Sequence, residues 1–269
     1  MKPYALILAA DLPHPHLVER LVRSLDPEID GVKIGLTTLI QAGLSFVQGI
    51  IEAVEGKPIL LDLKIADIGH RTGSGWEGTN AKILRSLKDT GVTHVTVHGF
   101  PGPVSLAEAV ATAHEIGIEV LVLPVMSHAG ADLFFSQGLN GKDFAKKASE
   151  AGIYISPASL EHVLRVRDGI MALGEAIEVD GYIGPATNLE ALAKIRAMTT
   201  KPIWCPGFGR QDRLGRDLVT QFQDWVRIVG PQSAAIVGSL IFSSPDPLGE
   251  ASRIREIRDR ALEFTSSQG

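Results

Sequence analysis

Residues 58–69, Pro-Ile-Leu-Leu-Asp-Leu-Lys-Ile-Ala-Asp-Ile-Gly, decide how the rest of this chain is interpreted. The stretch begins with the apolar run Pro58–Leu61, which predicts a parallel strand covered on both faces. Asp62 and Lys64 follow two residues apart, so on a strand both side chains point to the same side. Asp67 comes where the strand should give way to a loop. Charges placed at the end of an apolar strand are costly unless they pair, which indicates either a structural ion pair or an active site.

The composition is that of a globular protein with a large core: 269 residues, 45% hydrophobic and 21% charged. The net charge of −5 argues against broad binding to nucleic acid or to an anionic membrane. The single cysteine, Cys205, leaves no internal disulfide or cysteine-based metal cluster and fits a reducing compartment. No apolar run approaches the roughly 20 residues of a membrane span, and the apolar start is too short for a signal peptide. We therefore expect a cytoplasmic protein without nucleic-acid or membrane partners.

Short apolar runs alternate with amphipathic stretches along the whole chain. The expected strands are 4–10, 31–34, 58–64, 93–98, 119–124, 181–183, 202–205 and 234–237. The expected helices are 16–25, 36–53, 79–90, 104–116, 189–198 and 246–264. Eight strands alternating with helices predict parallel βαβ units. This count favours a single (β/α)8 TIM barrel over residues 1–269, with a doubly wound open sheet as the alternative.

The connection between the fifth and sixth strands is longer than a barrel needs. It holds two separate helical patterns, at 143–151 and 159–173. Because such connections are ordinarily short, we expect an extra helical insertion over residues 139–173, packed on the flank of the barrel.

Polar residues follow the ends of the expected strands. In chain order they are Asp11, Lys33, Asp62 with Lys64, His98, Ser127, Pro206-Gly207 and Gly238-Ser239. The carboxyl ends of barrel strands share one face, and that face carries the chemistry. Each residue alone has a simple structural explanation. Four successive strands that end in ionisable residues predict instead a charged ring, in which Asp and Lys keep one another ionised.

Together these residues resemble the orotidine 5′-phosphate decarboxylase family in its shorter, archaeal form. The resemblance rests on Asp11, Lys33-Ile34-Gly35, Asp62-x-Lys64-x-x-Asp67-Ile68, Val97–Gly102, Met126-Ser127-His128 and Pro206–Gly209. The motif D-x-K-x-x-D is the most specific, and sugar-phosphate enzymes of the same suprafamily share it. Those relatives use magnesium and typically carry Glu at the position of Lys33, so Lys33 favours the metal-free branch.

The resemblance implies loss of carbon dioxide from C6 of orotidine 5′-phosphate to give UMP, the last step of pyrimidine synthesis, without cofactor or metal. Lys33, Asp62, Lys64 and Asp67 would form the catalytic network of alternating charge. In it, Asp62 would lie against the substrate carboxylate, and Lys64 would stabilise and then protonate the C6 carbanion.

The resemblance also implies substrate-binding positions outside this network. Asp11 would hold ribose hydroxyls together with Lys33, Ser127 would hydrogen-bond the pyrimidine edge, and Pro206 would contribute from the loop after the seventh strand. His98 is expected to be structural.

A homodimer is implied by Asp67, Ile68 and Thr79, which in this family reach into the neighbouring subunit's site. Residues 69–78, between Asp67 and Thr79, form a longer segment than the family's, and its four glycines predict a mobile loop. Arg71 in this loop is a candidate anion ligand, although a plain surface insertion is the simpler interpretation.

The residues expected to bind the substrate phosphate depart from the family pattern. Gln211 and Gly238 match the family's Gln and Gly, but the family's Arg position holds Ser239. Losing a bidentate arginine should weaken phosphate binding by about 1.5–3 kcal/mol unless another group replaces it. Arg210 is the first candidate replacement. The other arginines of this loop are Arg213 and Arg216.

Four functions therefore stay open on the sequence. The first is orotidine 5′-phosphate decarboxylation, and the second is decarboxylation of a modified or unphosphorylated orotidine-like substrate, which Ser239 motivates. The third is a magnesium-dependent sugar-phosphate lyase on the same barrel. The fourth is a non-catalytic binding barrel, for which a charge array facing an anionic ligand has no use.

Overall fold

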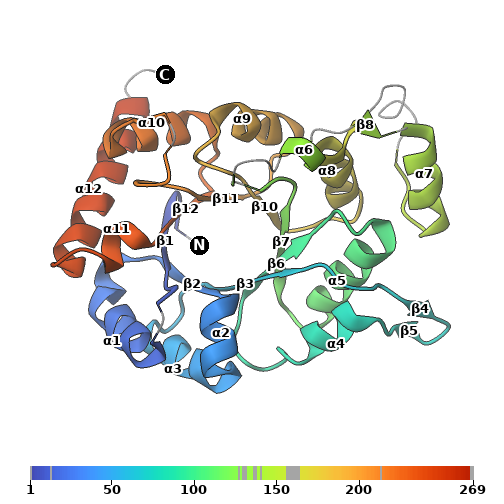
Figure 1. The fold of residues 1–269 in the computed structure, drawn as a ribbon, viewed down its shortest axis with the longest axis horizontal. Coiled ribbons are helices and arrows are strands. Elements are labelled where there is room, and N and C mark those ends of the chain that lie inside the picture. Colours follow the sequence, from blue (N-terminus) through green and yellow to red (C-terminus); the bar gives the residue numbers. More distant parts are fainter. Residues whose placement is uncertain are drawn as a thin grey trace. The chain divides into compact units, whose positions relative to one another are not determined.

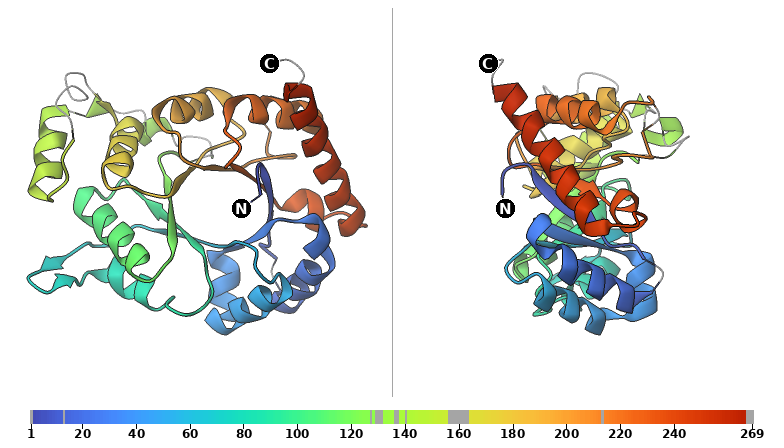
Figure 2. Two further views of the ribbon diagram at one scale, coloured as in Figure 1. Left: turned by 180° about the vertical axis from the view of Figure 1, so that it is seen from behind. Right: turned by 90° about the vertical axis from the view of Figure 1, so that its left-hand side faces the viewer.

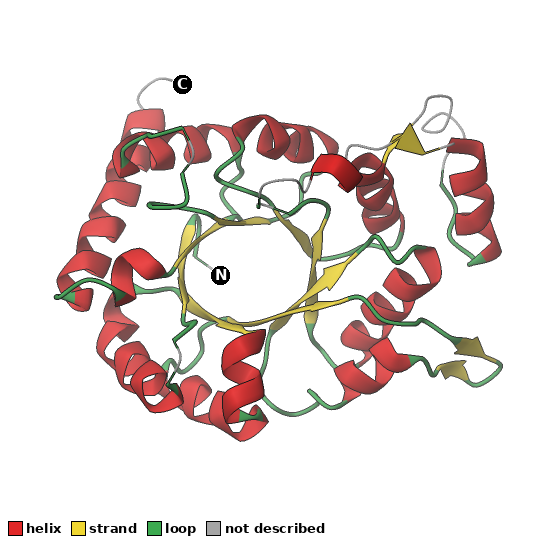
Figure 3. Ribbon diagram, viewed as in Figure 1, coloured by secondary structure: helices red, strands yellow, loops and turns green. Residues whose placement is uncertain are grey.

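A computed structural model describes residues 2–12, 14–126, 128, 132–135, 138–139, 141–155, 164–212 and 214–266. Eight parallel strands form a closed barrel in the order β1-β12-β11-β10-β7-β6-β3-β2. These strands are the yellow ring of Figure 3. The prediction of a (β/α)8 barrel is thus confirmed, and the open sheet is not what the chain forms.

The chain divides into two compact units, which are described separately. The first unit comprises Met1–Asp62, Thr90–Thr93 and Gly184–Gly269, and the second comprises Leu63–Asp89 and His94–Ile183. Strand β3, Ile59–Ile65, begins in the first unit and ends in the second.

The first unit contains both ends of the chain, coloured blue and orange to red in Figure 1. Its other strands are β1 (Ala5–Ala9), β2 (Gly31–Gly35), β11 (Ile203–Pro206) and β12 (Ala234–Val237). Its helices are α1 (Pro15–Leu25), α2 (Leu36–Ala42), α3 (Leu44–Ala53), α9 (Leu189–Met198), α10 (Leu218–Ile228), α11 (Ser239–Phe242) and α12 (Pro247–Ser266). The last helix, α12, lies beside α10 and α1 (Figures 1 and 2).

The second unit contains the remaining strands of the barrel, β6 (His94–His98), β7 (Glu119–Leu123) and β10 (Gly181–Ile183). Its helices are α4 (Thr79–Arg85), α5 (Pro103–Glu115), α6 (Asp132–Phe135), α7 (Gly141–Glu150) and α8 (Val166–Ala176). Two antiparallel pairs are added to it, β4 (Arg71–Thr72) with β5 (Gly75–Trp76), and β8 (Gly138–Leu139) with β9 (Leu164–Arg165).

The register within the first unit brings the predicted polar strand ends to one edge. Strand β1 lies between β12 and β2, and Ala9 pairs with Lys33. On the other side of β2, Gly35 pairs with Asp62 of β3. Because all these strands are parallel, their carboxyl ends lie at the same edge of the sheet.

Residues 36–53 differ from the sequence prediction, because they form two helices, α2 and α3, rather than one. Gly43 separates α2 from α3 with φ 74° and ψ 176°, a backbone conformation that is essentially restricted to glycine. Helix α4 is also shorter than predicted, since it ends at Arg85 rather than at residue 90.

The long connection contains helices, as expected, but with different bounds. Helix α7 confirms the prediction at 143–151. The prediction at 159–173 was wrong in its start, because residues 164–165 belong to β9 and α8 begins at Val166. Residues 156–163 lie outside the described part of the chain.

Within the predicted loop over residues 69–78, residues 71–76 form a β-hairpin. The Arg71 guanidinium lies 5.3 Å from the centre of the Trp76 ring, a cation–π contact across the hairpin. Arg85 of α4 also donates to the Trp76 carbonyl at 3.0 Å.

Helix α10 was not predicted from the sequence. It packs through Phe222 and Trp225, and Phe208 from the loop after β11 stacks on Phe222 with ring centres 4.6 Å apart. The helix thereby fixes the start of that loop.

Among the described helices, none is by itself long and apolar enough to cross a membrane. The pair α2 and α3 would meet the length and composition together, but the two helices are bent by 110°.

Candidate active site

Lys33 is the centre of the charged cluster in the first unit. Its Nζ lies 2.7 Å from Asp11 Oδ2 and 3.4 Å from Asp62 Oδ2. The Lys33 side chain is only 9% exposed, whereas those of Asp11 and Asp62 are 38% and 16% exposed. A buried ammonium is tolerated when carboxylates neutralise it, so the three groups form one mutually dependent set.

Gly35 makes room for this cluster. A Cβ atom at position 35 would lie 2.2 Å from Asp11 Oδ1, closer than any non-bonded contact allows. The side chain of Asp11 therefore occupies space that any other residue at position 35 would need.

Lys64 has an unusual backbone conformation for a strand residue. Its φ is +50°, in the left-handed region that side-chain-bearing residues rarely adopt. Its N–H donates to the hydroxyl of Thr96, a buried residue of β6, at 2.9 Å. Such conformations cost about 1–3 kcal/mol and cluster at functional sites, where the surrounding structure holds them in place.

Asp67, Ile68 and Thr79 lie together in the second unit. The Ile68 N–H donates to Asp67 Oδ1 at 2.7 Å, and the Thr79 N–H donates to the Ile68 carbonyl at 3.0 Å. Asn80, which was not among the predicted site residues, hydrogen-bonds both the N–H and the carbonyl of Asp67. Only its position after Thr79 hinted at such a role.

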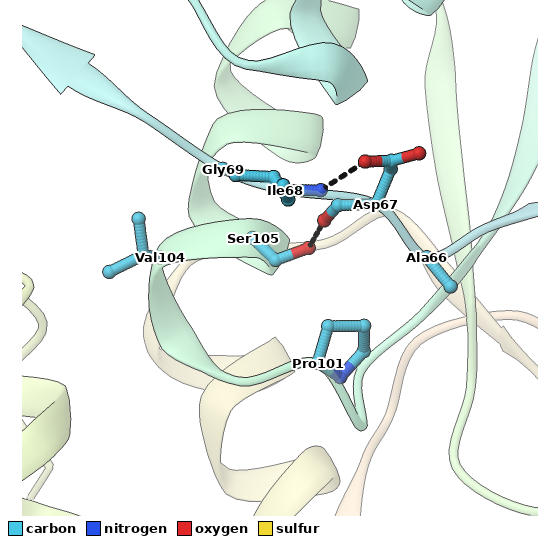
Figure 4. A pocket seen from close by; sticks show the side chains of 7 residues that line it. All are labelled: Ala66, Asp67, Ile68, Gly69, Pro101, Val104 and Ser105. Carbon is cyan, nitrogen blue, oxygen red and sulfur yellow. Dashed lines mark hydrogen bonds between the residues drawn. The ribbon is translucent and has the colours of Figure 1, made fainter.

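An open groove of about 500 Å³ lies against this segment (Figure 4). The residues that line it are Ala66, Asp67, Ile68, Gly69, Pro101, Val104 and Ser105. Ile68 is 70% exposed, and the nearby Phe100 is 56% exposed. An apolar surface of this kind on a loop with a charged residue is typical of an interaction surface.

The predicted phosphate residues follow β11 and β12, which are neighbours in the sheet. Pro206 ends β11, and the exposed residues Arg210 and Gln211 lie in the loop behind it. Gly238 directly follows β12, and Ser239 is the first residue of α11.

Arg216 is excluded as a substitute phosphate ligand by its partners. Its guanidinium bonds Asp224 Oδ2 at 3.0 Å and Asp212 Oδ1 at 2.5 Å, and it donates to the Ala186 carbonyl at 3.1 Å. Burial tends to lower the pKa of Arg216, but the two aspartates outweigh this and raise it. Arg216 therefore stabilises the loop rather than a ligand.

Two predicted residues lie outside the described part of the chain, namely Ser127 and Arg213. His98 ends β6, is buried, and packs on Phe100 with ring centres 4.9 Å apart. Among the residues that the structure describes, no three or more His, Cys, Asp or Glu side chains are grouped to hold a metal ion.

Comparison with known proteins gives a consistent result. The family model described as "Orotidine 5′-phosphate decarboxylase / HUMPS family" matches residues 4–254. The protein of Methanococcoides burtonii named orotidine 5′-phosphate decarboxylase is 29% identical over 255 residues, which cover 94% of this chain and 96% of that one. The enzyme of the same name from Thermoplasma acidophilum is 28% identical, with 98% and 99% of the two chains covered.

Solved structures share the fold. Orotidine 5′-monophosphate decarboxylase of Methanocaldococcus jannaschii, complexed with the inhibitor BMP, has a TM-score of 0.74 at 23% identity and covers 96% of this chain and 100% of its own. The Pyrococcus horikoshii enzyme has a TM-score of 0.69 at 24% identity, with 94% and 99% covered.

Proposed function

Because the chain belongs to the orotidine 5′-phosphate decarboxylase / HUMPS family, we propose that it decarboxylates orotidine 5′-phosphate to UMP. The observation that carries this proposal is the buried Lys33 ammonium held between Asp11 and Asp62. The sugar-phosphate branch of the suprafamily typically has Glu in place of this lysine, so the pairing favours the orotidylate reaction.

In the proposed reaction, Lys64 acts on the carbon that loses carbon dioxide. The bond between C6 and its carboxylate breaks, the electron pair stays on C6, and the Lys64 ammonium stabilises that charge before it donates its proton to C6. A cation held in place before the charge develops lowers the barrier without reorganisation. The left-handed backbone of Lys64 and its bond to Thr96 are what we expect of a side chain fixed in this way.

The carboxylates and Lys33 have complementary roles in this proposal. Asp62 faces the substrate carboxylate, and its charge disfavours this carboxylate more than the uncharged uracil ring of the product. Lys33 pairs with Asp62 and, together with Asp11, binds the ribose hydroxyls. The mutual contacts of the three groups support this assignment.

We assign phosphate binding to the loops after β11 and β12. TIM barrels commonly bind phosphate with the loops after strands seven and eight and with a short extra helix, the position that α11 has here. Gly238, Ser239 and Gln211 belong to these segments. The exposed Arg210 is the arginine that replaces the family's ligand, because Arg216 is already paired.

Ser239 also favours a second candidate, decarboxylation of an orotidine-like nucleoside that carries no phosphate or a modified one. A serine cannot form the bidentate contact of an arginine. Comparing orotidine with orotidine 5′-phosphate as substrates separates the two candidates.

The proposed enzyme is a cytoplasmic homodimer in which Asp67, Ile68 and Thr79 complete the partner's site. The exposed Ile68 and the groove beside it support this assembly, since such apolar surface is ordinarily covered by a partner.

The experiment follows the ultraviolet absorbance of the orotate ring after the protein is mixed with orotidine 5′-phosphate. We expect the chromophore to disappear with the native chain and with Lys88→Ala, a control at an exposed lysine, but not with Lys64→Ala. EDTA should have no effect. Loss of this turnover in EDTA would contradict the metal-free mechanism, and turnover of orotidine alone would support the second candidate.

A further inference from the structure

Asn80 is a fully buried polar residue whose side chain hydrogen-bonds the backbone of the exposed residue Asp67. We propose that Asn80, together with Ser105, is a positioning residue that holds Asp67 in place for the partner subunit's active site. This inference rests on the shared site proposed above and assigns a function to residues that do not touch substrate.

The side-chain amide of Asn80 pairs with both backbone groups of Asp67. Its Oδ1 accepts from the Asp67 N–H at 3.1 Å, and its Nδ2 donates to the Asp67 carbonyl at 3.0 Å. Nδ2 also donates to the carbonyl and the hydroxyl of Ser105, at 3.1 and 2.9 Å. Rotating the amide by 180° would set its oxygen against three oxygens, so only one orientation satisfies the site.

Ser105, near the start of α5, provides a further hydrogen bond to the Asp67 backbone. Its hydroxyl donates to the Asp67 carbonyl at 2.6 Å, the bond drawn in Figure 4. The Asp67 carbonyl thus accepts from side chains of two helices, α4 and α5. Two donors that converge on one acceptor restrict its direction as well as its distance.

Close packing against α5 further restricts the backbone that follows Ile68. A Cβ atom at Gly69 would lie 2.6 Å from the Val104 carbonyl oxygen, so the chain is pressed against α5 directly after Ile68. On the other side, buried Glu108 accepts from the Gly78 N–H at 2.5 Å and fixes the return of the hairpin.

The contrast between the exposed residues Asp67 and Ile68 and the buried residues that hold them indicates a function. Asp67 and Ile68 are exposed, yet the groups that hold their backbone are among the most buried polar residues of the second unit. A surface loop without a function does not require such a buried polar network, which is costly unless every bond is made. A catalytic group, in contrast, must be held within about 0.5 Å of its working position.

Asn80→Asp tests the proposal with little change in shape. The variant keeps an acceptor for the Asp67 N–H but turns the donor into an oxygen that faces the oxygens of Asp67 and Ser105. We expect kcat to fall about 100-fold with little change in KM, because Asp67 is misplaced while the remaining substrate contacts stay intact. Ser105→Ala should lower kcat by about tenfold.

Thr112→Val is the matched control for these variants. Thr112 is also buried in α5, but its hydroxyl has no hydrogen-bond partner among the described residues. Its replacement should leave kcat and KM unchanged.

Hybrid dimers distinguish positioning from structural damage. In a dimer of one Lys64→Ala and one Asn80→Asp subunit, the site with intact Lys64 receives Asp67 from the subunit with intact Asn80. We therefore expect such hybrids to regain about half of the native activity, although each homodimer is impaired. If Asn80→Asp does not fold, Ser105→Ala takes its place.

Hybrids that stay at the activity of the Asn80→Asp homodimer would overturn the inference, since the damage would then lie within that subunit's own barrel. Hybrids of Lys64→Ala with Asp67→Ala are the reference for the shared site itself. Failure of the reference would reject the shared site and the inference with it, whereas failure of the Asn80 hybrid alone would reject only the positioning role.

Discussion

At the scale of single residues, Lys64 combines a functional group with an unfavourable backbone. A left-handed conformation costs a residue with a Cβ atom about 1–2 kcal/mol, and glycine does not have this penalty. The chain nevertheless has lysine at this position, with Thr96 accepting its N–H. The proposed chemistry accounts for that choice, because only the ammonium can stabilise and protonate a carbanion.

The strained backbone of Lys64 predicts that glycine and alanine at this position differ in their effect on stability. Lys64→Gly should be about 1 kcal/mol more stable than Lys64→Ala, because glycine adopts the φ of +50° without strain. Both variants should lack decarboxylase activity. Urea unfolding at equal m-value measures the difference.

Lys88 provides the control for that comparison. It is an exposed lysine whose φ is not positive, so Lys88→Gly should be less stable than Lys88→Ala. Equal stability of the two Lys64 variants would contradict the interpretation of its backbone as strained.

The sequence was informative about these residues where charge and spacing were sufficient. An Asp-x-Lys pair at the end of an apolar strand, with a lysine at the end of the previous strand, predicted that charges would meet, and Lys33 does contact Asp62. The sequence could not predict the space that Gly35 leaves for Asp11 or the hydrogen bonds from Asn80 to Asp67, because both depend on tertiary packing.

At the scale of elements, the same limit separates strands from helices. Buried parallel strands are continuous apolar runs, so their positions were clear from the sequence. Gly43 instead interrupts an apolar helical pattern through its backbone conformation, which periodicity does not reveal. Helix α10 follows a charged loop, and its packing face of Gln221, Phe222, Trp225 and Val226 is evident only with the neighbouring helices in place.

Gly43, between α2 and α3, and Gly49, within α3, should differ in their response to replacement by alanine. Gly43→Ala should destabilise the protein by about 1–3 kcal/mol, because its φ of 74° and ψ of 176° suit only glycine although no atom lies within 4 Å of the added Cβ. Gly49→Ala should stabilise by about 0.5–1 kcal/mol, because Gly49 lies within α3 and its Cβ would meet Glu19 at an ordinary 3.5 Å.

Chemical denaturation of both variants measures these effects, and each glycine serves as the other's control. A neutral Gly43→Ala would show that α2 and α3 can join into one helix. That outcome would restore the single helix that the sequence pattern predicts.

At the scale of the whole molecule, an ion pair ties the last helix to the first strands. Arg258 of α12 lies 2.9 Å from Asp30 Oδ2 and donates to the Tyr4 carbonyl at 3.3 Å. Asp30 also accepts from the Leu6 N–H at 2.9 Å, and Lys2 lies 2.8 Å from its other oxygen. The two ends of the chain are therefore joined through one buried carboxylate in the first unit.

This carboxylate predicts how stability depends on pH. Burial alone raises the pKa of Asp30, but the hydrogen bonds from Lys2 and Leu6 and the charge of Arg258 outweigh it and hold the pKa below its ordinary value. A depressed pKa means that the folded state binds this proton less tightly than the unfolded chain. The stabilisation is therefore complete above the unfolded pKa of about 4 and is lost as the pH falls through the folded value. Asp30→Asn should be less stable at pH 7 by about 3 kcal/mol, because the buried Arg258 loses its buried carboxylate and keeps only Asp259, whose side chain is 50% exposed. The variant should also lose less stability than the native chain as the pH falls from about 5 to about 2. Thermal unfolding across that range measures both effects, and parallel acid curves for the two proteins would mean that other carboxylates cause the acid sensitivity.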